Sequence, residues 1–195
     1  MLSLCHLTKL TTKNGQIKFM KNIRVVITGT VGAGKSTFVR TASEIDVVEI
    51  ERQVSNSEKE YSFKDKTTVA FDFGKLVLDA KNNLHLYGTP GQTRFDFMWD
   101  ILIKGAEAYI LLVKANQADS FSYAKDILAF MNDRVQVPMV IGLTHTDCSG
   151  AIPTEEIVKH LGILNAKDCP AILKVNPRLK NSVVTALNVL INKVI

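Results

Sequence analysis

The stretch that decides the fold is Gly29-Thr30-Val31-Gly32-Ala33-Gly34-Lys35-Ser36, which follows the pattern G-x-x-x-x-G-K-S. It comes directly after a short, mostly β-branched run over 23–28 (Ile-Arg-Val-Val-Ile-Thr), which is typical of a buried strand. The residues that follow, 35–42, favour a helix. A strand, a glycine-rich turn and a helix in this order are the context in which this pattern wraps around phosphate groups. The sequence therefore predicts a phosphate-binding loop.

Each part of this loop has a physical role. Glycines let the backbone approach phosphate oxygens with its N–H groups pointing inward, and the start of the helix adds the positive end of its dipole. We expect Lys35 to bridge the terminal phosphates and Ser36 to place its hydroxyl on Mg²⁺. The predicted nucleotide contacts are Gly29, Gly32, Ala33, Gly34, Lys35, Ser36 and Thr37. Kinases, ATPases and GTPases share such a loop, so it does not select the reaction.

The rest of the chain alternates between strand and helix signals. Further strands are expected over 67–79, 84–87, 108–113, 138–143 and 171–175, and helices over 92–103, 120–132, 153–161 and 181–193. Residues 44–66 are polar and indicate a long loop, and Gly74 indicates a bend or bulge. Strands separated by helices imply parallel crossovers, whereas 67–79 and 84–87 form a hairpin. The expected fold class is an α/β P-loop NTPase with three α/β/α layers, a mostly parallel six-stranded sheet and one antiparallel hairpin strand.

Composition and charge narrow the class of protein. The 195 residues include 24 basic and 19 acidic side chains, a formal net charge of +5, and 46% are hydrophobic. These values suit one globular domain, and no apolar run is long enough to span a bilayer, so stable membrane insertion is not expected. Three cysteines without a C-x-x-C spacing indicate reduced thiols and a cytoplasmic location.

The positive charge is concentrated at the start of the chain. Residues 1–43 contain seven basic side chains and no acidic one. Residues 1–20 show no persistent apolar face and are expected to form a flexible N-terminal extension, with the domain over 21–195. That domain is close to neutral, so nucleic acid is not an expected partner.

A second motif carries a resemblance to a known family. Residues 88–92 (Gly-Thr-Pro-Gly-Gln), together with 67–74 (Thr-Thr-Val-Ala-Phe-Asp-Phe-Gly), 94–95 (Arg-Phe) and 97–100 (Phe-Met-Trp-Asp), resemble prokaryotic Ras-like small GTPases. The resemblance covers about residues 21–194 and is to the MglA-related group found in operons that also encode Roadblock-type proteins. It implies a switch that binds GTP or GDP with Mg²⁺, hydrolyses GTP and is regulated by a Roadblock-type partner.

The resemblance also implies roles for particular residues. Gly91 is similar to the glycine whose N–H senses the γ-phosphate, and Gln92 is similar to the glutamine that orients the attacking water. Thr68 is similar to the switch threonine, which holds the metal together with Ser36. The catalytic residues implied are Gln92, Lys35 and Thr68.

Two positions depart from the Ras-like pattern. Gly88 stands where the family has an aspartate that holds Mg²⁺ through a water molecule. Asp72, on the neighbouring strand of the hairpin, is a candidate substitute, and the alternative is an ordinary exposed carboxylate. Val31 stands where Ras proteins have glycine, and its bulk predicts slow intrinsic hydrolysis.

The base-reading segment of GTPases has the pattern N/T-K-x-D, in which the aspartate binds guanine and the lysine lies along the base and holds the phosphate loop. This chain has Thr144-His145-Thr146-Asp147 after the strand over 138–143. Thr144, His145 and Asp147 are therefore expected base contacts, joined by Asn176 and Arg178 after the last strand. The sequence favours guanine over adenine; the alternative is that Asp147 caps the turn before Gly150.

Two other functions stay open at this level. One is a nucleotide-binding scaffold with negligible hydrolysis, which Gly88 and Val31 favour and Gln92 opposes. The other is an ATP-binding kinase or ATPase, which the loop alone permits. An aromatic-rich stretch at Phe95, Phe97, Met98 and Trp99 is either a docking surface for a partner or part of the core.

Overall fold

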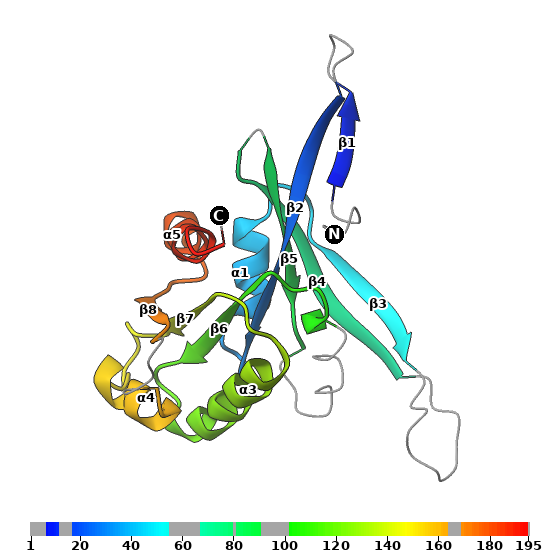
Figure 1. The fold of residues 1–195 in the computed structure, drawn as a ribbon. Helices are drawn as coiled ribbons and strands as arrows, with labels where there is room; N and C mark the ends of the chain where they lie inside the picture. The colour runs from blue at the N-terminus through cyan, green and yellow to red at the C-terminus, as the bar shows by residue number, and fades with distance from the viewer. Residues whose placement is uncertain are drawn as a thin grey trace.

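One mixed β-sheet runs through the centre of the molecule (Figure 1). The structure is a computed structural model that describes residues 7–11, 17–54, 67–79, 81–90, 102–163 and 169–194. Its strands are β1 (Leu7–Thr11), β2 (Ile17–Gly29), β3 (Val48–Val54), β4 (Thr67–Val77), β5 (Asn82–Gly88), β6 (Ala108–Lys114), β7 (Met139–Thr144) and β8 (Ala171–Lys174). Its helices are α1 (Lys35–Ala42), the short 3₁₀ helix η3 (Ala118–Ser120), α3 (Phe121–Arg134), α4 (Thr154–Leu161) and α5 (Lys180–Ile191).

The predicted fold class is confirmed. The strand order is β3-β4-β5-β2-β6-β7-β8, with β1 paired to β2. Strands β5, β2, β6, β7 and β8 are parallel, and β4 pairs antiparallel with β5, which gives the six predicted strands. Strands β1 and β3 are additional and enlarge the sheet to eight strands.

Strand β3 corrects one expectation. The sequence predicted a loop over 44–66, but residues 48–54 pair antiparallel with β4, from Val48 opposite Phe73 to Val54 opposite Thr67. The segment alternates apolar and polar residues (Val-Glu-Ile-Glu-Arg-Gln-Val), the pattern of a strand at the edge of a sheet. The charged residues of this segment favoured the prediction of a loop. A strand at the edge of a sheet, however, tolerates charged residues.

The start of the chain also enters the sheet. Residues 7–11 form β1, which pairs antiparallel with the first residues of β2, and β2 begins at Ile17 rather than near residue 23. Part of the segment expected as an extension is therefore paired backbone. The division into an extension over 1–20 and a domain over 21–195 stays a prediction.

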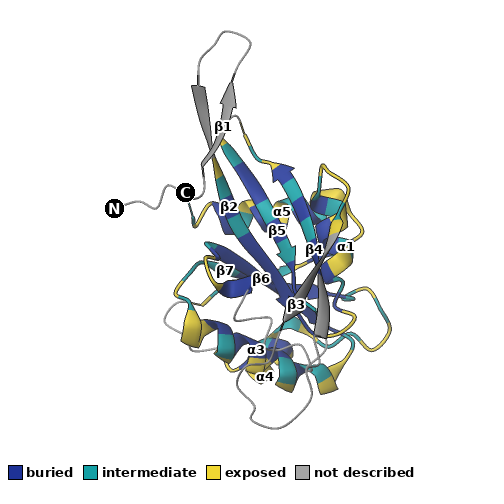
Figure 2. Cartoon of the chain, turned by 90° about the vertical axis from the view of Figure 1, so that its right-hand side faces the viewer, coloured by how far each residue is buried: buried dark blue, intermediate teal, exposed yellow. Residues whose placement is uncertain are grey.

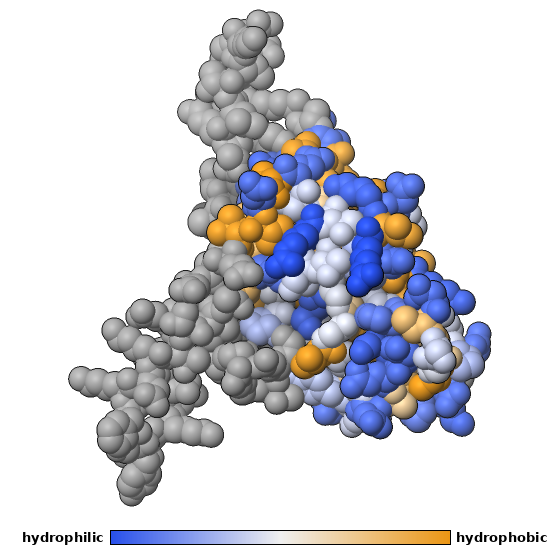
Figure 3. Space-filling view, turned by 180° about the vertical axis from the view of Figure 1, so that it is seen from behind, coloured by the Kyte–Doolittle hydropathy of each residue, from blue (hydrophilic) through white to orange (hydrophobic). Residues whose placement is uncertain are grey.

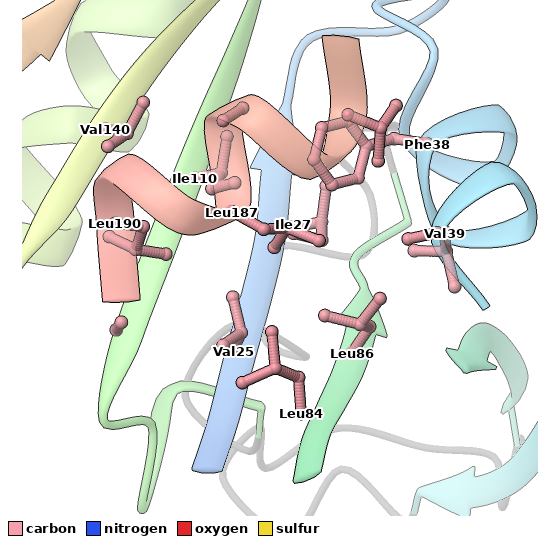
Figure 4. Close-up of a cluster of buried hydrophobic side chains, with 14 of the residues drawn as sticks. Val25, Ile27, Phe38, Val39, Leu84, Leu86, Ile110, Val140, Leu187 and Leu190 are labelled. Carbon is pink, nitrogen blue, oxygen red and sulfur yellow. The ribbon is translucent and has the colours of Figure 1, made fainter. Parts of the chain in front are cut away.

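Helices α1 and α5 cover one face of the sheet (Figure 4). Alternate residues of β2 point to this face because side chains alternate along a strand. There Val25 and Ile27 pack with Phe38 of α1 and Leu187 of α5, and all four are fully buried. Each such side chain contributes roughly 1.5–3 kcal/mol through burial. This core fixes the end of β2 against the start of α1, and with it the loop between them.

Gly74 lies within this face and differs from its predicted role. The β4–β5 ladder continues through it without a bulge, since Phe73, Gly74 and Lys75 pair with successive residues of β5. A Cβ at position 74 would lie 2.9 Å from Val39 Cγ1 and 3.0 Å from Ser43 Cβ. The glycine therefore allows the close approach of α1 to β4.

Helices α3 and α4 cover the opposite face. Val26, Leu111 and Val113 pack there with Ile127 of α3 and Ile157 of α4, and other residues of this second core surround them. Figure 2 shows the buried sheet between helices whose outer surfaces are exposed. The described surface seen from behind is mostly hydrophilic, with small hydrophobic patches between the polar residues (Figure 3). Among the described segments, no helix has the length and apolar character needed to cross a membrane.

Candidate nucleotide-binding site

The phosphate loop connects β2 to α1, as predicted. Strand β2 ends at Gly29 and α1 begins at Lys35, and the Phe38 N–H donates to the Gly34 carbonyl in the first turn. Gly34 has a φ of 91°, and a Cβ there would lie 2.8 Å from Pro177 Cγ. A side chain at position 34 would thus be strained and would press on the loop after β8. The glycine keeps these two loops in contact.

Lys35 is held at the centre of the loop. Its side chain is only 7% exposed, and Nζ donates to the carbonyls of Gly29 (2.9 Å) and Thr30 (2.8 Å). Burial lowers the pKa of Lys35 to about 8, and the negative charge of Asp72 opposes that shift. Two of the three ammonium donors are used by carbonyls that carry only partial charge. A phosphate oxygen could accept the third hydrogen bond and would add a full negative charge directly at the ammonium.

A cavity of about 510 Å³ opens beside the loop. Its walls come from the phosphate loop, the segment after β7 and the segment after β8. They include Gly32, Gly34, Thr37, His145, Asp147, Asn176 and Arg178. These seven residues were predicted from three separate parts of the sequence, and the structure brings them together. The volume is that of an ordinary small-molecule site.

Other predicted contacts lie around the cavity. Gly29 ends β2, the Ala33 side chain is fully buried in the core, and Ser36 is exposed at the start of α1. Thr144 is also fully buried, and its Oγ1 lies 3.0 Å from His145 Nδ1. Thr144 is therefore placed to orient His145, and a direct contact with a base stays a prediction.

The base end of the cavity carries several charged groups. His145 has a φ of 57°, the left-handed conformation that turns the chain toward Asp147. The pKa of His145 is lowered by burial first, then by the positive charges of Lys114 and Arg178, while Asp147 raises it. Asp147 is exposed to the cavity. The Asn176 side chain accepts a hydrogen bond from the Arg178 N–H at 3.0 Å, which orders the loop that carries Arg178.

Several predicted residues lie outside the described part of the chain. These are Gly91 and Gln92, the aromatic stretch Phe95, Phe97, Met98 and Trp99, and all but the last two residues of the helix expected over 92–103. Thr68 belongs to β4, but its side chain is also outside the description. The roles of Thr68, Gly91 and Gln92 therefore stay predictions.

Asp72 lies next to the position that a side chain at Gly88 would occupy. It lies opposite Gly88 in the β4–β5 ladder and is only 9% exposed, so it is not an ordinary surface carboxylate. A Cβ at position 88 would lie 3.2 Å from both Cβ and Oδ2 of Asp72. No three His, Cys, Asp or Glu side chains gather into a cage within the described residues. Mg²⁺ needs no such cage, because it is commonly held by one or two carboxylates, hydroxyls, waters and substrate phosphates.

A site built this way is that of a P-loop NTPase, so the chain is a nucleotide-binding P-loop protein. Its fold is that of the small GTPases. The solved structure of the Arl6 BBS3 small GTPase from Trypanosoma brucei, with the bound nucleotide analogue GppNp, matches it with a TM-score of 0.67. The match covers 88% of this chain and 96% of that one at 15% sequence identity, so it shows the fold alone.

The chain belongs to the family described as conserved hypothetical ATP binding protein, whose model matches residues 45–190. The phosphate loop lies before the matched segment. One relative is the uncharacterized protein MJ1339 of Methanocaldococcus jannaschii, which is 28% identical over 135 residues, or 69% of this chain and 77% of that protein. The narrower resemblance to MglA-related proteins stays a prediction.

The sequence analysis missed one residue near this site. Lys114, the last residue of β6, lies beside both the phosphate loop and His145. No motif marks it, because its place depends on how β6 and β7 pair. Its only sequence signal is a charge at the carboxyl end of a buried strand, where ligand sites of α/β sheets gather.

Proposed function

We propose that this protein is a GTP-binding switch that hydrolyses GTP to GDP slowly with Mg²⁺. The observation that carries the base preference is the Asp147 carboxylate at the base end of the cavity. A carboxylate only accepts hydrogen bonds. Guanine presents two adjacent N–H donors along one edge, whereas adenine presents a ring nitrogen that is itself an acceptor. Asp147 therefore favours guanine.

We assign the other predicted residues to the phosphate end of the same reaction. Lys35 and the N–H groups of the loop neutralise phosphate charge, while Ser36 and Thr68 would hold the metal and Gln92 would orient water. Mg²⁺, when bound, would supply charge neutralisation at the phosphates. Val31 is 59% exposed on the loop, and its bulk beside the phosphates supports slow intrinsic hydrolysis. We also propose that a Roadblock-type protein regulates this switch and that the protein is cytoplasmic.

Asp147→Asn tests the base preference. We expect the wild-type chain to bind GTP on the order of a hundredfold more tightly than ATP, and the variant to lose most of that preference. Xanthine has a carbonyl where guanine has its amine, so the new amide can donate to it, and xanthosine triphosphate should bind the variant better than GTP. Competition of each nucleotide against a fluorescent analogue measures this. Asp126→Asn, an exposed carboxylate of α3, is the control. An unchanged GTP-to-ATP ratio in Asp147→Asn would remove Asp147 from base selection.

Asp72→Asn tests the substitute carboxylate. We expect nucleotide affinity to lose most of its dependence on Mg²⁺, since the variant keeps the shape of the side chain and removes its charge. Affinity is measured across a Mg²⁺ titration, again with Asp126→Asn as control. A swapped variant, Asp72→Gly with Gly88→Asp, should recover the Mg²⁺ dependence, because the two side chains occupy neighbouring space. Wild-type Mg²⁺ dependence in Asp72→Asn would contradict this role.

A second candidate function is ATP binding. The family description names ATP, and His145 replaces the lysine of the guanine-reading pattern. The same competition assay distinguishes GTP binding from ATP binding. If ATP displaces the fluorescent analogue at lower concentrations than GTP does, ATP binding replaces the proposal of a GTP-binding switch. A scaffold without hydrolysis is distinguished by single-turnover phosphate release, measured with and without a Roadblock-type protein. A background rate in both conditions would favour the scaffold.

A further inference from the structure

Lys114 lies where two parts of the nucleotide site meet. It is the last residue of β6 and pairs with Thr144, the last residue of β7. The next N–H along the chain, that of Ala115, donates to the Thr144 carbonyl at 2.8 Å. These contacts fix the backbone of Lys114 beside the start of the base-reading segment.

The ammonium group of Lys114 reaches the phosphate loop. Its Nζ lies 3.9 Å from the position that a Cβ on Gly32 would occupy, and Gly32 is part of the cavity wall. Within the part of the chain that the structure describes, no group accepts a hydrogen bond from this ammonium or forms an ion pair with it. Its side chain is half-buried, so its electrostatic interactions with neighbouring groups are stronger than those of a fully solvated lysine. An ammonium group without a bonded acceptor among the described residues thus lies beside the loop.

His145 is placed differently. It stands at the position of the lysine that GTPases use to hold the phosphate loop, but one ring nitrogen lies 3.0 Å from Thr144 Oγ1. The imidazole is shorter than a lysine side chain. Its pKa is lowered by burial and then by the positive charge of Lys114, which lies near the ring as well as near Gly32. The ring can lie along a base but is poorly placed to hold the loop.

We propose that Lys114, supplied by the neighbouring strand, holds the phosphate loop at Gly32 in place of the lysine that the base-reading segment lacks. The two tasks of one side chain are divided, with His145 lying along the base and Lys114 fixing the loop. Lys114 is then a positioning residue, and its effect is to slow dissociation of the nucleotide. The inference rests on the proposed function, because it concerns the same site.

Lys114→Gln in the full chain tests the idea. We expect a preloaded fluorescent GDP to dissociate about tenfold faster during a chase with excess GDP, because a charged contact to the loop is lost. Lys114→Arg should keep the wild-type rate. The double variant Lys114→Gln with His145→Lys should dissociate GDP at close to the wild-type rate, because it restores a lysine at the residue that follows β7.

Lys125 provides a matched control. Its Nζ lies 3.8 Å from the Cβ position of Gly162, the same lysine-beside-glycine geometry between α3 and the end of α4. Lys125→Gln should leave the rate unchanged. A wild-type rate in Lys114→Gln, or a double variant no slower than Lys114→Gln, would overturn the proposal. If Lys114→Gln fails to fold, Lys114→Arg decides through its rate alone, with faster dissociation overturning the proposal.

A readout without nucleotide confirms the contact. The pKa of His145, followed by NMR, should rise in Lys114→Gln, because a positive neighbour no longer disfavours the protonated ring. It should stay fixed in Lys125→Gln, and an unmoved pKa in Lys114→Gln would also overturn the proposal. The GTP-to-ATP preference belongs to Asp147 and should not change. If the wild type prefers ATP, the proposed function fails, and the same variants measured with ADP still decide the role of Lys114.

Discussion

Lys35→Ala is expected to weaken nucleotide binding by about a thousandfold. The variant removes charge-assisted hydrogen bonds to phosphate, and a loss of about 4 kcal/mol corresponds to that factor. The Lys35 Nζ is fixed at the centre of the loop by the carbonyls of Gly29 and Thr30. Binding of a fluorescent GDP measures the effect, and Lys104→Ala, at an exposed turn, is the control. Affinity within tenfold of the wild type would contradict the role of Lys35.

The same variant has a pH signature in stability. The folded pKa of Lys35 is about 8, below its ordinary value of 10.5, so the folded chain favours the neutral form. The cost of the buried charge is therefore fully present below pH 8 and disappears as the pH rises through 10.5. Relative to Lys35→Ala, the wild type should gain up to about 3 kcal/mol of unfolding free energy over that interval. Denaturation of both proteins without nucleotide, at pH 7.5 and pH 10, measures the difference.

Gly29→Ala is expected to cause the largest loss of stability. Gly29 has a φ of 144° and pairs with Leu112 of β6, and a Cβ there would lie 2.1 Å from the Leu112 carbonyl oxygen. That atom belongs to the backbone of a central strand and cannot move without disrupting the sheet. We expect a loss of more than about 4 kcal/mol in the free energy of unfolding. Urea denaturation measures it.

Gly105→Ala separates this collision from the cost of backbone conformation. Gly105 also has a positive φ, 79°, but nothing lies within 4 Å of its Cβ position. Only the strain of a left-handed alanine remains, about 1 kcal/mol. Equal losses in the two variants would show that the contact with Leu112 does not matter.

Much of the fold could be predicted because its signals are local. The apolar run of β2, the glycine-rich loop and the first turn of α1 each follow from neighbouring residues, and all were confirmed. Strand β3 was missed because an edge strand keeps polar residues that resemble a loop. Gly74 was assigned to a bulge because the packing of α1 against β4 cannot be read from local sequence.

The candidate site could likewise be predicted only in part. The sequence pointed to Lys35 and Asp147 because their motifs are continuous, and the cavity brings their segments together. It could name Asp72 as a candidate but not as a buried carboxylate beside Gly88, since that depends on the register of β4 and β5. Lys114 was not found at all, because it enters the site only through the pairing of β6 with β7.

The close approach of Gly34 to Pro177 has a consequence for ligand binding. These residues belong to the loops at the phosphate end and the base end of the cavity, which approach so closely that a Cβ on Gly34 would lie 2.8 Å from Pro177 Cγ. This close packing restricts how far the phosphate loop can move relative to the loop after β8. If the proposed nucleotide binds with its base at Asp147, a substitution at Pro177 should therefore also alter binding of its phosphates at the other end of the site.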